Sequence, residues 1–401
     1  MRFEPINVSR RAFAATLSAV TSGFSNASEA LSASAHPLIN VGPQRAVKTL
    51  AEAARLVVDG SRVAVDAGTY VGDVAVWTRN DLSLIASGGR VRLIADGAHA
   101  EGKGIWVVRA RGMTVEGFDF EGAAVPSGNG AAIRLESGSL TVRDCSFTHN
   151  ENGILTSNDP QVELSIENSE FARNTRPDGQ THLLYAGRIK RLSVTGSYFH
   201  HATAGHLLKS RAALNHIFYN RLTDEAEGRA SYELEFASGG VAYVVGNIIQ
   251  QSPSTENPHF ISYGVEGYRW PVNELHLVHN TLVDDRANAG VFLRVKPGDA
   301  TVHVVNNLLV GSASWNGGSS AKMHNNVSIK RSQLGTTGDE AFRMKANVAA
   351  GMIPLPVALA KGEKLAPDRQ YLHPRQTIAL RAPPTLPGAL QPDRPPHNER
   401  F

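Results

Sequence analysis

Cysteine is almost missing from the 401-residue chain, which has only Cys145. A single cysteine excludes an internal disulfide and most cysteine-based metal sites. Cys145 occupies a repeat position at which other repeats carry Asn or Ser, and this argues against a catalytic thiol. A strong charge is also missing, because charged residues make up 19% of the chain and the net charge is only +3. No field of one sign points to a nucleic acid or to an anionic membrane.

Long apolar runs are scarce too. No stretch after residue 35 approaches the ~18–20 apolar residues that a membrane helix needs, so we expect no membrane partner. The segment Ser9–Phe13 (SRRAF) resembles the bacterial twin-arginine export signal, and Ala33–Ala35 offers a small-residue cleavage site. We therefore expect residues 1–35 to be a signal peptide and the mature protein to be periplasmic or secreted. The alternative is a basic, disordered tail.

Short blocks of alternating apolar and polar residues recur along the chain, each centred on an anchor position that is often Asn. The anchors are separated by 27, 24, 28, 23, 27, 33 and 27 residues. A short, nearly fixed period of alternating strands predicts a β-solenoid, with apolar side chains stacked inside and the anchor amides hydrogen-bonded in a ladder. The anchors are Phe118, Cys145, Ser169, Ser197, Asn220, Asn247, Asn280 and Asn307.

Helical spacing over residues 46–57, stopped by Gly60 and followed by an alternating strand over 62–70, resembles the opening of right-handed parallel β-helix proteins of the pectate-lyase-like superfamily. The resemblance implies an all-β, single-stranded right-handed parallel β-helix with an N-terminal helical cap. We expect one β-helix domain over 36–345 and a Pro-rich closing segment over 346–401, frayed from Leu386 onward. The interval of 33 residues predicts an inserted loop between Asn247 and Asn280.

Lys209 and Arg211 stand two residues apart, so both side chains leave a strand by the same face. Leu208 is expected to point inward, which places the two cations outward. His206 lies either at a turn or buried and hydrogen-bonded. Counting back eleven residues from the anchors aligns Lys209 with Phe236. Tyr263 follows Phe236 by one 27-residue interval, and Tyr185 precedes Lys209 because His-Leu-Leu at 182–184 recurs at 206–208. The predicted column is Tyr185, Lys209, Phe236 and Tyr263, and a neighbouring column is His182, His206 and Glu233.

Glu233 and Glu235 follow one repeat later and are expected to share an outward face, turned there by a bulge near residue 232. Outward charges on adjacent coils can be a solvated ion-pair lattice worth ~0–1 kcal/mol per pair. The concentration of ionisable and aromatic groups in a few coils favours a functional site instead. We expect Lys209, Arg211, His206 and Tyr263 to be catalytic. The expected substrate-binding residues are His182, Tyr185, Glu233, Glu235, Glu266 and Arg294.

A flat groove of side-chain columns suits an extended polysaccharide. In uronic acid β-elimination one group neutralises the carboxylate, a base removes the C5 proton, and an acid assists the leaving oxygen. Arg211 suits the first role, and Lys209 suits the second if burial and Arg211 lower its pKa. Tyr263, Tyr185 or His206 could be the acid.

The fragments Leu208–Ser210 and Glu233–Phe236 are similar to the catalytic coils of β-helix alginate and chondroitin lyases. The resemblance implies a lysine base on the first strand and an arginine on the next coil. Here Glu235 replaces that arginine, and Ala204 and Gly205 stand where calcium ligands are expected, so Arg211 or Arg294 would have to neutralise the substrate. No cofactor is predicted, although calcium stays open.

The expected partner is an anionic polysaccharide, and the protein is expected to be a monomer. The leading hypothesis is an exported lyase or epimerase that acts on a uronic-acid-containing polysaccharide. One alternative is a glycoside hydrolase that uses Glu233 and Glu235 as its acid–base pair. Another alternative is a β-helix that binds the polysaccharide without any catalysis.

Overall fold

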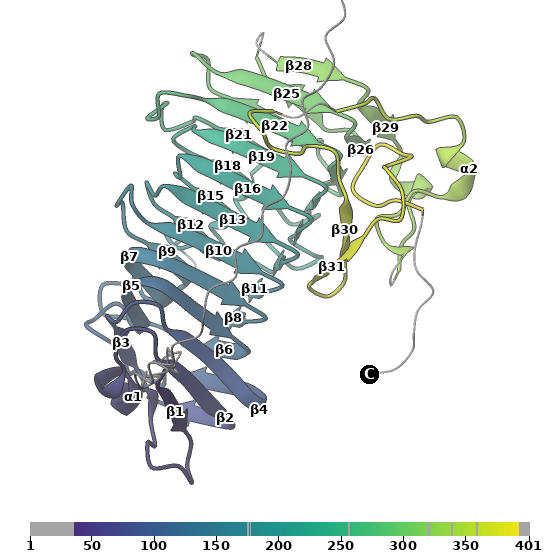
Figure 1. The fold of residues 1–401 in the computed structure, drawn as a ribbon. Helices are drawn as coiled ribbons and strands as arrows, with labels where there is room; N and C mark the ends of the chain where they lie inside the picture. The colour runs from purple at the N-terminus through teal and green to yellow at the C-terminus, as the bar shows by residue number, and fades with distance from the viewer. Residues whose placement is uncertain are drawn as a thin grey trace, which may run out of the picture. The chain divides into compact units, whose positions relative to one another are not determined.

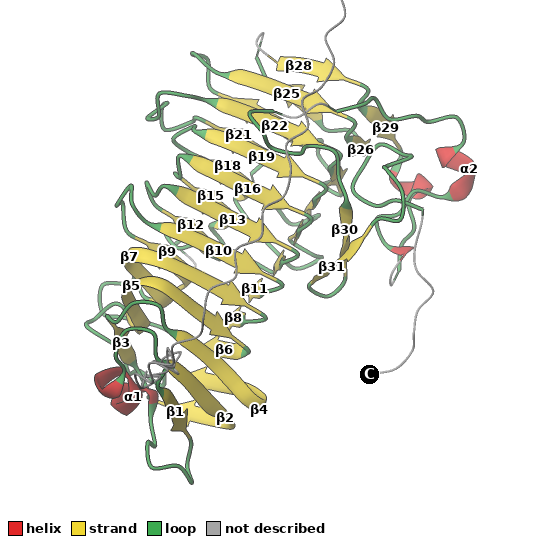
Figure 2. Ribbon diagram, viewed as in Figure 1, coloured by secondary structure: helices red, strands yellow, loops and turns green. Residues whose placement is uncertain are grey.

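The computed structural model describes residues 36–174, 176, 178–255, 257–318, 321–337, 340–357 and 360–392. The expected signal peptide lies outside these residues. From residue 38 to residue 329, each strand pairs in parallel with a strand of a neighbouring coil, and the inner strands pair on both sides (Figure 1). The chain is therefore an all-β parallel solenoid, which confirms the predicted fold class. Figure 2 shows how little helix the described chain contains.

Three parallel sheets form the sides of the solenoid, and we call them sheets 1, 2 and 3. The long strands β2 and β4 run from sheet 1 into sheet 2, and β5 and β7 run from sheet 3 into sheet 1. Sheet 1 contains β1 (Leu38–Val41), β2 (Arg62–Val71), β4 (Ser83–Ile94), β5 (Gly104–Glu116), β7 (Ala131–Arg143), β10 (Glu163–Glu167), β13 (Arg191–Thr195), β16 (Leu214–Phe218), β19 (Val241–Val245), β22 (Glu274–Val278), β25 (Thr301–Val305) and β28 (Ala321–His324).

Sheet 2 adds β6 (Phe118–Glu121), β8 (Ser146–Thr148), β11 (Glu170–Ala172), β14 (Tyr198–His200), β17 (Arg221–Thr223), β20 (Ile248–Gln251), β23 (Thr281–Asp284), β26 (Leu308–Val310) and β29 (Val327–Ile329). Sheet 3 adds β3 (Ala75–Trp77), β9 (Asn152–Thr156), β12 (Leu184–Ala186), β15 (His206–Ser210), β18 (Tyr232–Phe236), β21 (His259–Tyr263), β24 (Val291–Val295) and β27 (Ser314–Asn316). The remaining elements are α1 (Leu50–Leu56), a 3₁₀ turn (Arg331–Gln333), α2 (Ala346–Ala349) and the antiparallel pair β30 (Arg369–Leu372) and β31 (Gln376–Ala379).

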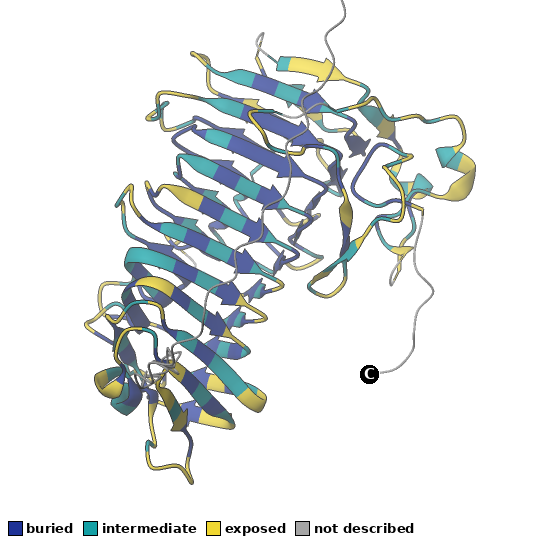
Figure 3. Cartoon of the chain, in the orientation of Figure 1, coloured by how far each residue is buried: buried dark blue, intermediate teal, exposed yellow. Residues whose placement is uncertain are grey.

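Buried residues recur along the strands of successive coils (Figure 3). Their apolar side chains form one large core cluster inside the solenoid. Phe120, Phe147, Phe171 and Phe199 stack with ring centroids 5.1, 4.6 and 4.7 Å apart. Such distances follow from the ~4.8 Å spacing between parallel strands. Each coil therefore packs mainly on its two neighbours, as in other repeat proteins.

The anchor ladder lies at the turn between sheets 1 and 2. Asn247 accepts hydrogen bonds from the backbone N–H and side chain of Asn220, and donates to the side chain of Asn280, at 2.9 to 3.0 Å. Asn280 donates in the same way to Asn307. The residue before each of these asparagines has a positive φ, so the chain turns sharply there. The asparagine side chains form hydrogen bonds with the backbone groups of the turn. The structural role predicted for the anchors is confirmed.

Helix α1 is shorter than the expected span of 46–57. Thr49 accepts a hydrogen bond from the N–H of Glu52, and Asp73 accepts from the N–H groups of Leu50 and Ala51, so the first turn of the helix is capped. Leu50 is buried in the main core. That the helix caps the end of the solenoid stays a prediction.

The described part of the C-terminal segment packs against sheets 1 and 2. The Tyr219 hydroxyl donates to Asp368, Glu363 lies 3.2 Å from His216, and the N–H of Ala389 donates to Thr281. The expectation that the chain frays from Leu386 is wrong for residues 386–392, because Ala389 is buried in a cluster with residues of β20, β23 and β26. Residues 393–401 lie outside the described part.

Candidate functional site

The outer face of sheet 3 carries most of the charged and aromatic side chains that the sequence predicts to form a functional site. In Figure 1 strands β12, β15, β18 and β21 follow one another along this side of the solenoid. The backbone register aligns Tyr185 with Lys209, Lys209 with Glu235, Glu235 with Ser262, and Ser262 with Arg294. Five coils thus contribute one outward column.

The predicted column was wrong by one residue from β18 onward. Glu235, not Phe236, aligns with Lys209, and Ser262, not Tyr263, follows it. The turn between β15 and β16 has three residues (211–213), whereas the turn between β18 and β19 has four (237–240). Counting back from the anchors assigned this additional turn residue to the strand.

Strand β15 does not alternate regularly. Leu207 and Leu208 are both fully buried, while His206 before them and Lys209 after them both reach Glu235. His206 is therefore hydrogen-bonded and nearly buried, but it lies on the outer side with Lys209. Two consecutive inward residues let both polar side chains share that side.

Glu235 is the centre of the site. One of its oxygens, Oε2, lies 3.0 Å from Nε2 of His206 and 2.9 Å from Nζ of Lys209. The other oxygen, Oε1, accepts a hydrogen bond from the Ser262 hydroxyl at 3.2 Å. Burial alone would raise the pKa of Glu235, but His206 and Lys209 outweigh burial and lower that pKa to about 2. Glu235 is therefore ionised at neutral pH.

Lys209 lies between two carboxylates. Its Nζ is 2.9 Å from Glu235 and 2.9 Å from Glu266, and the side chain is 12% exposed. Burial lowers the pKa of Lys209, but attraction and hydrogen bonds from the two glutamates exceed that effect, so its pKa is raised. The base role expected of Lys209 needs a lowered pKa, and this arrangement makes Lys209 a cation instead.

Glu266 comes from the inserted loop. The turn between β21 and β22 has ten residues (264–273), six more than the turn between β18 and β19, and these six account for the long anchor interval. The loop extends Glu266 back over β15, where its carboxylate accepts two hydrogen bonds from Arg211, each 2.8 Å long. Trp270 of the same loop donates to the backbone oxygen of Arg211. The loop thus holds both the side chain and the backbone of Arg211.

Tyr185 forms an aromatic surface beside the cations. The guanidinium carbon of Arg211 lies 5.1 Å from the ring centroid, and Nζ of Lys209 lies 5.8 Å from it. His182 contacts the same ring edge-on and lies 4.4 Å from the ring of His206. Burial and the nearby cations keep the pKa of His182 well below its ordinary value. His182 is thus a neutral partner in the packing of this site.

Two expected site residues lie inside the solenoid rather than on its outer face. The Tyr263 ring is fully buried against Phe236, and its hydroxyl donates to the backbone oxygen of Gly240. Glu233 is also fully buried and accepts a hydrogen bond from Gln251. Burial, with the nearby Asp224, raises the pKa of Glu233 well above its ordinary value. The expectation that Glu233 and Glu235 face outward together is wrong, because the irregular strand turns them to opposite sides.

Further along this column, Arg294 aligns with Asn316 of β27. Arg294 is exposed and donates to the Tyr232 hydroxyl at 3.4 Å. Tyr232 contacts the ring of His206, and its ring centroid lies 6.1 Å from that of His259. Tyr232, His259 and Lys296 were not expected at the site. Lys296 stands two residues after Arg294, the same spacing as Lys209 and Arg211, and this spacing could have identified it.

The outer faces of sheets 1 and 2 carry the C-terminal segment. In the described part of the chain, hydrogen bonds from residues 346–392 to the solenoid go to these two sheets and to the turn between them. Sheet 3 is therefore the side on which an extended ligand can lie. No group of three or more His, Cys, Asp or Glu side chains in the described residues is arranged to hold a metal ion.

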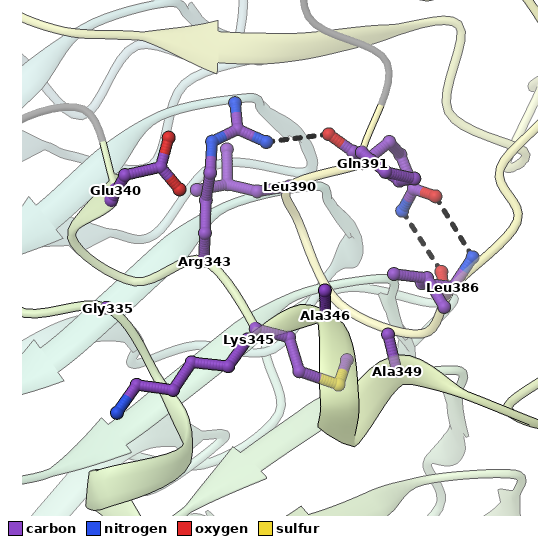
Figure 4. Close-up of a pocket in the computed structure, with 11 residues that line it drawn as sticks. Gly335, Glu340, Arg343, Lys345, Ala346, Ala349, Leu386, Leu390 and Gln391 are labelled. Carbon is purple, nitrogen blue, oxygen red and sulfur yellow. Dashed lines mark hydrogen bonds between the residues drawn. The ribbon is translucent and has the colours of Figure 1, made fainter.

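A cavity of about 440 Å³ lies elsewhere, where the segment closes on residues 335–349 (Figure 4). Its polar groups hold the chain together, since Arg343 donates to the backbone oxygen of Gln391. The Gln391 side chain also donates to Leu386. This cavity therefore belongs to the packing of the C-terminal segment.

Comparison with known proteins shows the fold. The structure is similar to that of pectate lyase Pel9A, at 13% identity over 89% of this chain and 97% of that chain, with a TM-score of 0.51. It also matches a pectin methylesterase in complex with a hexasaccharide, at 10% identity over 79% of this chain and 98% of that chain, with a TM-score of 0.34. No family model and no curated protein matches. In the described residues no helix is long and apolar enough to cross a membrane.

Proposed function

We propose that the chain acts on a uronic-acid-containing polysaccharide, which lies along the outer face of sheet 3. One observation carries the proposal: Lys209 and Arg211 already hold a carboxylate, that of Glu266, beside the ring of Tyr185. An arginine with two parallel bonds is the group best suited to a planar carboxylate. An adjacent aromatic ring can stack on a sugar. A uronate supplies both features in one residue.

The reaction that we propose is β-elimination. Lys209 and Arg211 neutralise the substrate carboxylate, which makes the C5 proton more acidic. A base removes that proton, the C4–O bond breaks, and an acid returns a proton to the leaving oxygen, so a double bond forms between C4 and C5. Because the pKa of Lys209 is raised, we assign the proton transfers to Tyr185 and to the His206–Glu235 pair.

The test is a panel of soluble polyuronates, among them polygalacturonate and alginate, with ultraviolet absorbance as the readout for the unsaturated product. Wild type is expected to release this product from at least one polymer. The variant Arg211→Ala is expected to lose at least about tenfold in rate, because it leaves the carboxylate of the substrate unneutralised. Lys322→Ala, an exposed cation on sheet 1, is the matched control and should keep the wild-type rate. Absence of the product with every polymer contradicts the lyase.

Binding without catalysis is the second candidate function. The observation that favours it is that Lys209, Glu235 and Glu266 neutralise one another, so no ionised group next to Arg211 is left as a free base. Under this candidate, wild type retards a polyuronate in affinity electrophoresis and releases no product, and Arg211→Ala abolishes the retardation. New reducing ends without unsaturation would instead indicate a hydrolase. The buried Glu233 makes the expected carboxylate pair unsuitable for that role.

We propose export by the twin-arginine route, supported by the Ser9–Phe13 motif. We also propose a monomer that needs no cofactor. Cleavage or binding should therefore be unchanged when EDTA is added, and loss of either with EDTA would return calcium to the mechanism.

A further inference from the structure

The cation pair of sheet 3 occurs twice. Lys209 in β15 and Arg211 directly after that strand stand two residues apart. Arg294 in β24 and Lys296 directly after it repeat this spacing. The register through Glu235 and Ser262 places Arg294 in the column of Lys209, three coils further along. Backbone hydrogen bonds place the second members alike, since the N–H of Arg211 donates to Ala186 and that of Lys296 to Tyr263, each on the preceding coil.

The two pairs differ in their anionic partner. Arg211 and Lys209 bind the carboxylate of Glu266. Among the residues that the structure describes, no Asp or Glu oxygen lies within 4.0 Å of the side-chain nitrogens of Arg294 or Lys296, and both residues are exposed. Two neighbouring exposed cations repel each other, and binding an anion lowers their electrostatic energy. The second pair is thus a carboxylate site of the same design with no carboxylate of the protein in it.

Aromatic rings connect the two pairs. Beside the charged column, the rings of His206, Tyr232 and His259 follow one another along the solenoid, with centroids 5.0 and 6.1 Å apart. The hydroxyl of Tyr232 accepts a hydrogen bond from Arg294. Rings of this kind can pack on successive sugars between two charged positions. The surface from Tyr185 to Lys296 therefore has the features of one extended binding face.

We propose that Arg294 and Lys296 form a second carboxylate subsite, so that the ligand is an oligomer with at least two carboxylates separated by three coil spacings. At ~4.8 Å per coil, the backbone positions of the two pairs lie ~14 Å apart along the solenoid. A single sugar acid has one carboxylate and fills one pair at most. This inference rests on the proposed function, because it names the length and charge pattern of the ligand for the same face.

The physical consequence is a dependence of affinity on ligand length. An oligomer that reaches both pairs binds the second carboxylate intramolecularly, and the effective concentration of that carboxylate is on the order of millimolar or higher. Oligomers too short to reach gain nothing from the second pair. The affinity should therefore rise in a step at the length that spans three coils, and the step should shrink as salt screens the exposed charges.

Isothermal titration calorimetry with size-fractionated oligouronates, from monomer to octamer, measures this step on the full-length protein. Wild type is expected to show it as a gain of about tenfold or more in affinity. The double variant Arg294→Ala/Lys296→Ala should bind short oligomers as wild type does and lose the step. Lys322→Ala controls for the loss of surface charge on another sheet. Circular dichroism establishes that each variant is folded.

The outcomes separate the inference from the proposed function. If wild type binds oligomers in a way that Arg211→Ala abolishes, but the double variant keeps the full step, the second subsite is wrong and the proposed function stands. If the affinity does not change with length, the second subsite is also wrong. If no oligomer of any length binds to wild type or to Glu266→Gln, the proposed function is wrong, and the second subsite falls with it.

Discussion

Glu266 fills a carboxylate site with a carboxylate of the protein itself. Its side chain is 38% exposed and accepts hydrogen bonds from both Lys209 and Arg211. Burial alone would raise the pKa of Glu266, but these two cations lower it, so the group is ionised at neutral pH. A polyuronate that binds to the same cations must therefore displace an anion that is always present.

Substituting this glutamate should strengthen ligand binding. In Glu266→Gln the amide keeps one acceptor oxygen but removes the competing charge. We expect polyuronate affinity to increase by up to about fivefold, because one exposed ion pair contributes about 0.2–1 kcal/mol. Titration calorimetry measures the change. Glu163→Gln, which removes a half-buried, ion-paired carboxylate on sheet 1, is the control and should bind as wild type does. An unchanged or weaker affinity of Glu266→Gln would show that Glu266 does not occupy the ligand's position.

The pKa of Glu235 makes the stability of the protein depend on pH. The pKa is about 2 in the folded protein and 4.5 for the ordinary group, so the folded state favours the ionised form. This contribution is complete above pH ~4.5 and is lost as the pH falls toward ~2, and at ~1.4 kcal/mol per unit it is at most on the order of 3–4 kcal/mol.

Glu235→Gln removes this titration. Wild type is expected to be the more stable protein at pH 6, as measured by urea unfolding, because the variant leaves Lys209 and His206 without their shared partner. The gap between the two proteins should narrow as the pH falls to 3. If the difference in unfolding free energy stays constant or widens at low pH, Glu235 is not ionised in the folded protein as described.

The sequence predicted which coils carry the candidate site, but it did not predict the side on which every residue lies. Lys209 and Arg211 lie outward as predicted. Tyr185 aligns with Lys209, also as predicted, because the same three residues, His-Leu-Leu, occur close before both in their coils. Glu233 and Tyr263 were misplaced for a physical reason. One additional turn residue shifts the predicted column by one residue. In a strand, a shift of one residue exchanges an inward side chain for an outward one.

The turn between sheets 1 and 2 is held mainly by the asparagine ladder. The buried amide of Asn247 donates to Ile217, to Val245 and to Asn280, and it accepts from Asn220. The repeat revealed the ladder because Asn recurs at a fixed anchor. The same repeat could not show where the inserted loop goes, since the direction of residues 264–273 depends on contacts such as that of Trp270 with Arg211.

Removing one rung of the ladder should destabilise the solenoid. Asn247→Ala removes the side chain that the buried backbone N–H of Asn220 and the backbone oxygen of Ile217 bond, and at ~1–3 kcal/mol per unsatisfied group we expect a loss of about 3 kcal/mol. The midpoint of urea unfolding measures the change. Asn288→Ala, at an exposed position, should shift the midpoint very little. Equal midpoints for the two variants would mean that the ladder does not stabilise the fold.

At the scale of the whole chain, different sides of the solenoid serve different purposes. Sheets 1 and 2 receive the C-terminal segment, with apolar contacts such as those of Leu365 and Tyr371 and with the Tyr219–Asp368 hydrogen bond. Sheet 3 presents its charged and aromatic column outward. Composition alone indicated a Pro-rich tail, but it could not show that the tail packs on two sheets, because such packing depends on individual partners far away in the sequence.

This division predicts that the segment and the ligand act independently. Tyr219→Phe removes a hydroxyl that donates to Asp368 at 3.0 Å and accepts from its N–H at 3.2 Å. We expect a loss of about 1 kcal/mol in the anchoring of the segment, seen as faster amide hydrogen exchange over residues 360–380. Polyuronate affinity should stay within about twofold of wild type, the scatter expected of a distant substitution.

In the same exchange experiment, a bound polyuronate should protect sheet 3 between residues 182 and 296 and leave the C-terminal segment unchanged. Tyr70→Phe removes a comparable hydroxyl bond to Asp66 in the early coils and is the control for the chemistry of the substitution. The opposite pattern is also measurable. If Tyr219→Phe weakens ligand binding as much as Arg211→Ala does, or if the ligand protects residues 360–380, the ligand lies on the side of the C-terminal segment. The open face of sheet 3 would then have a different role.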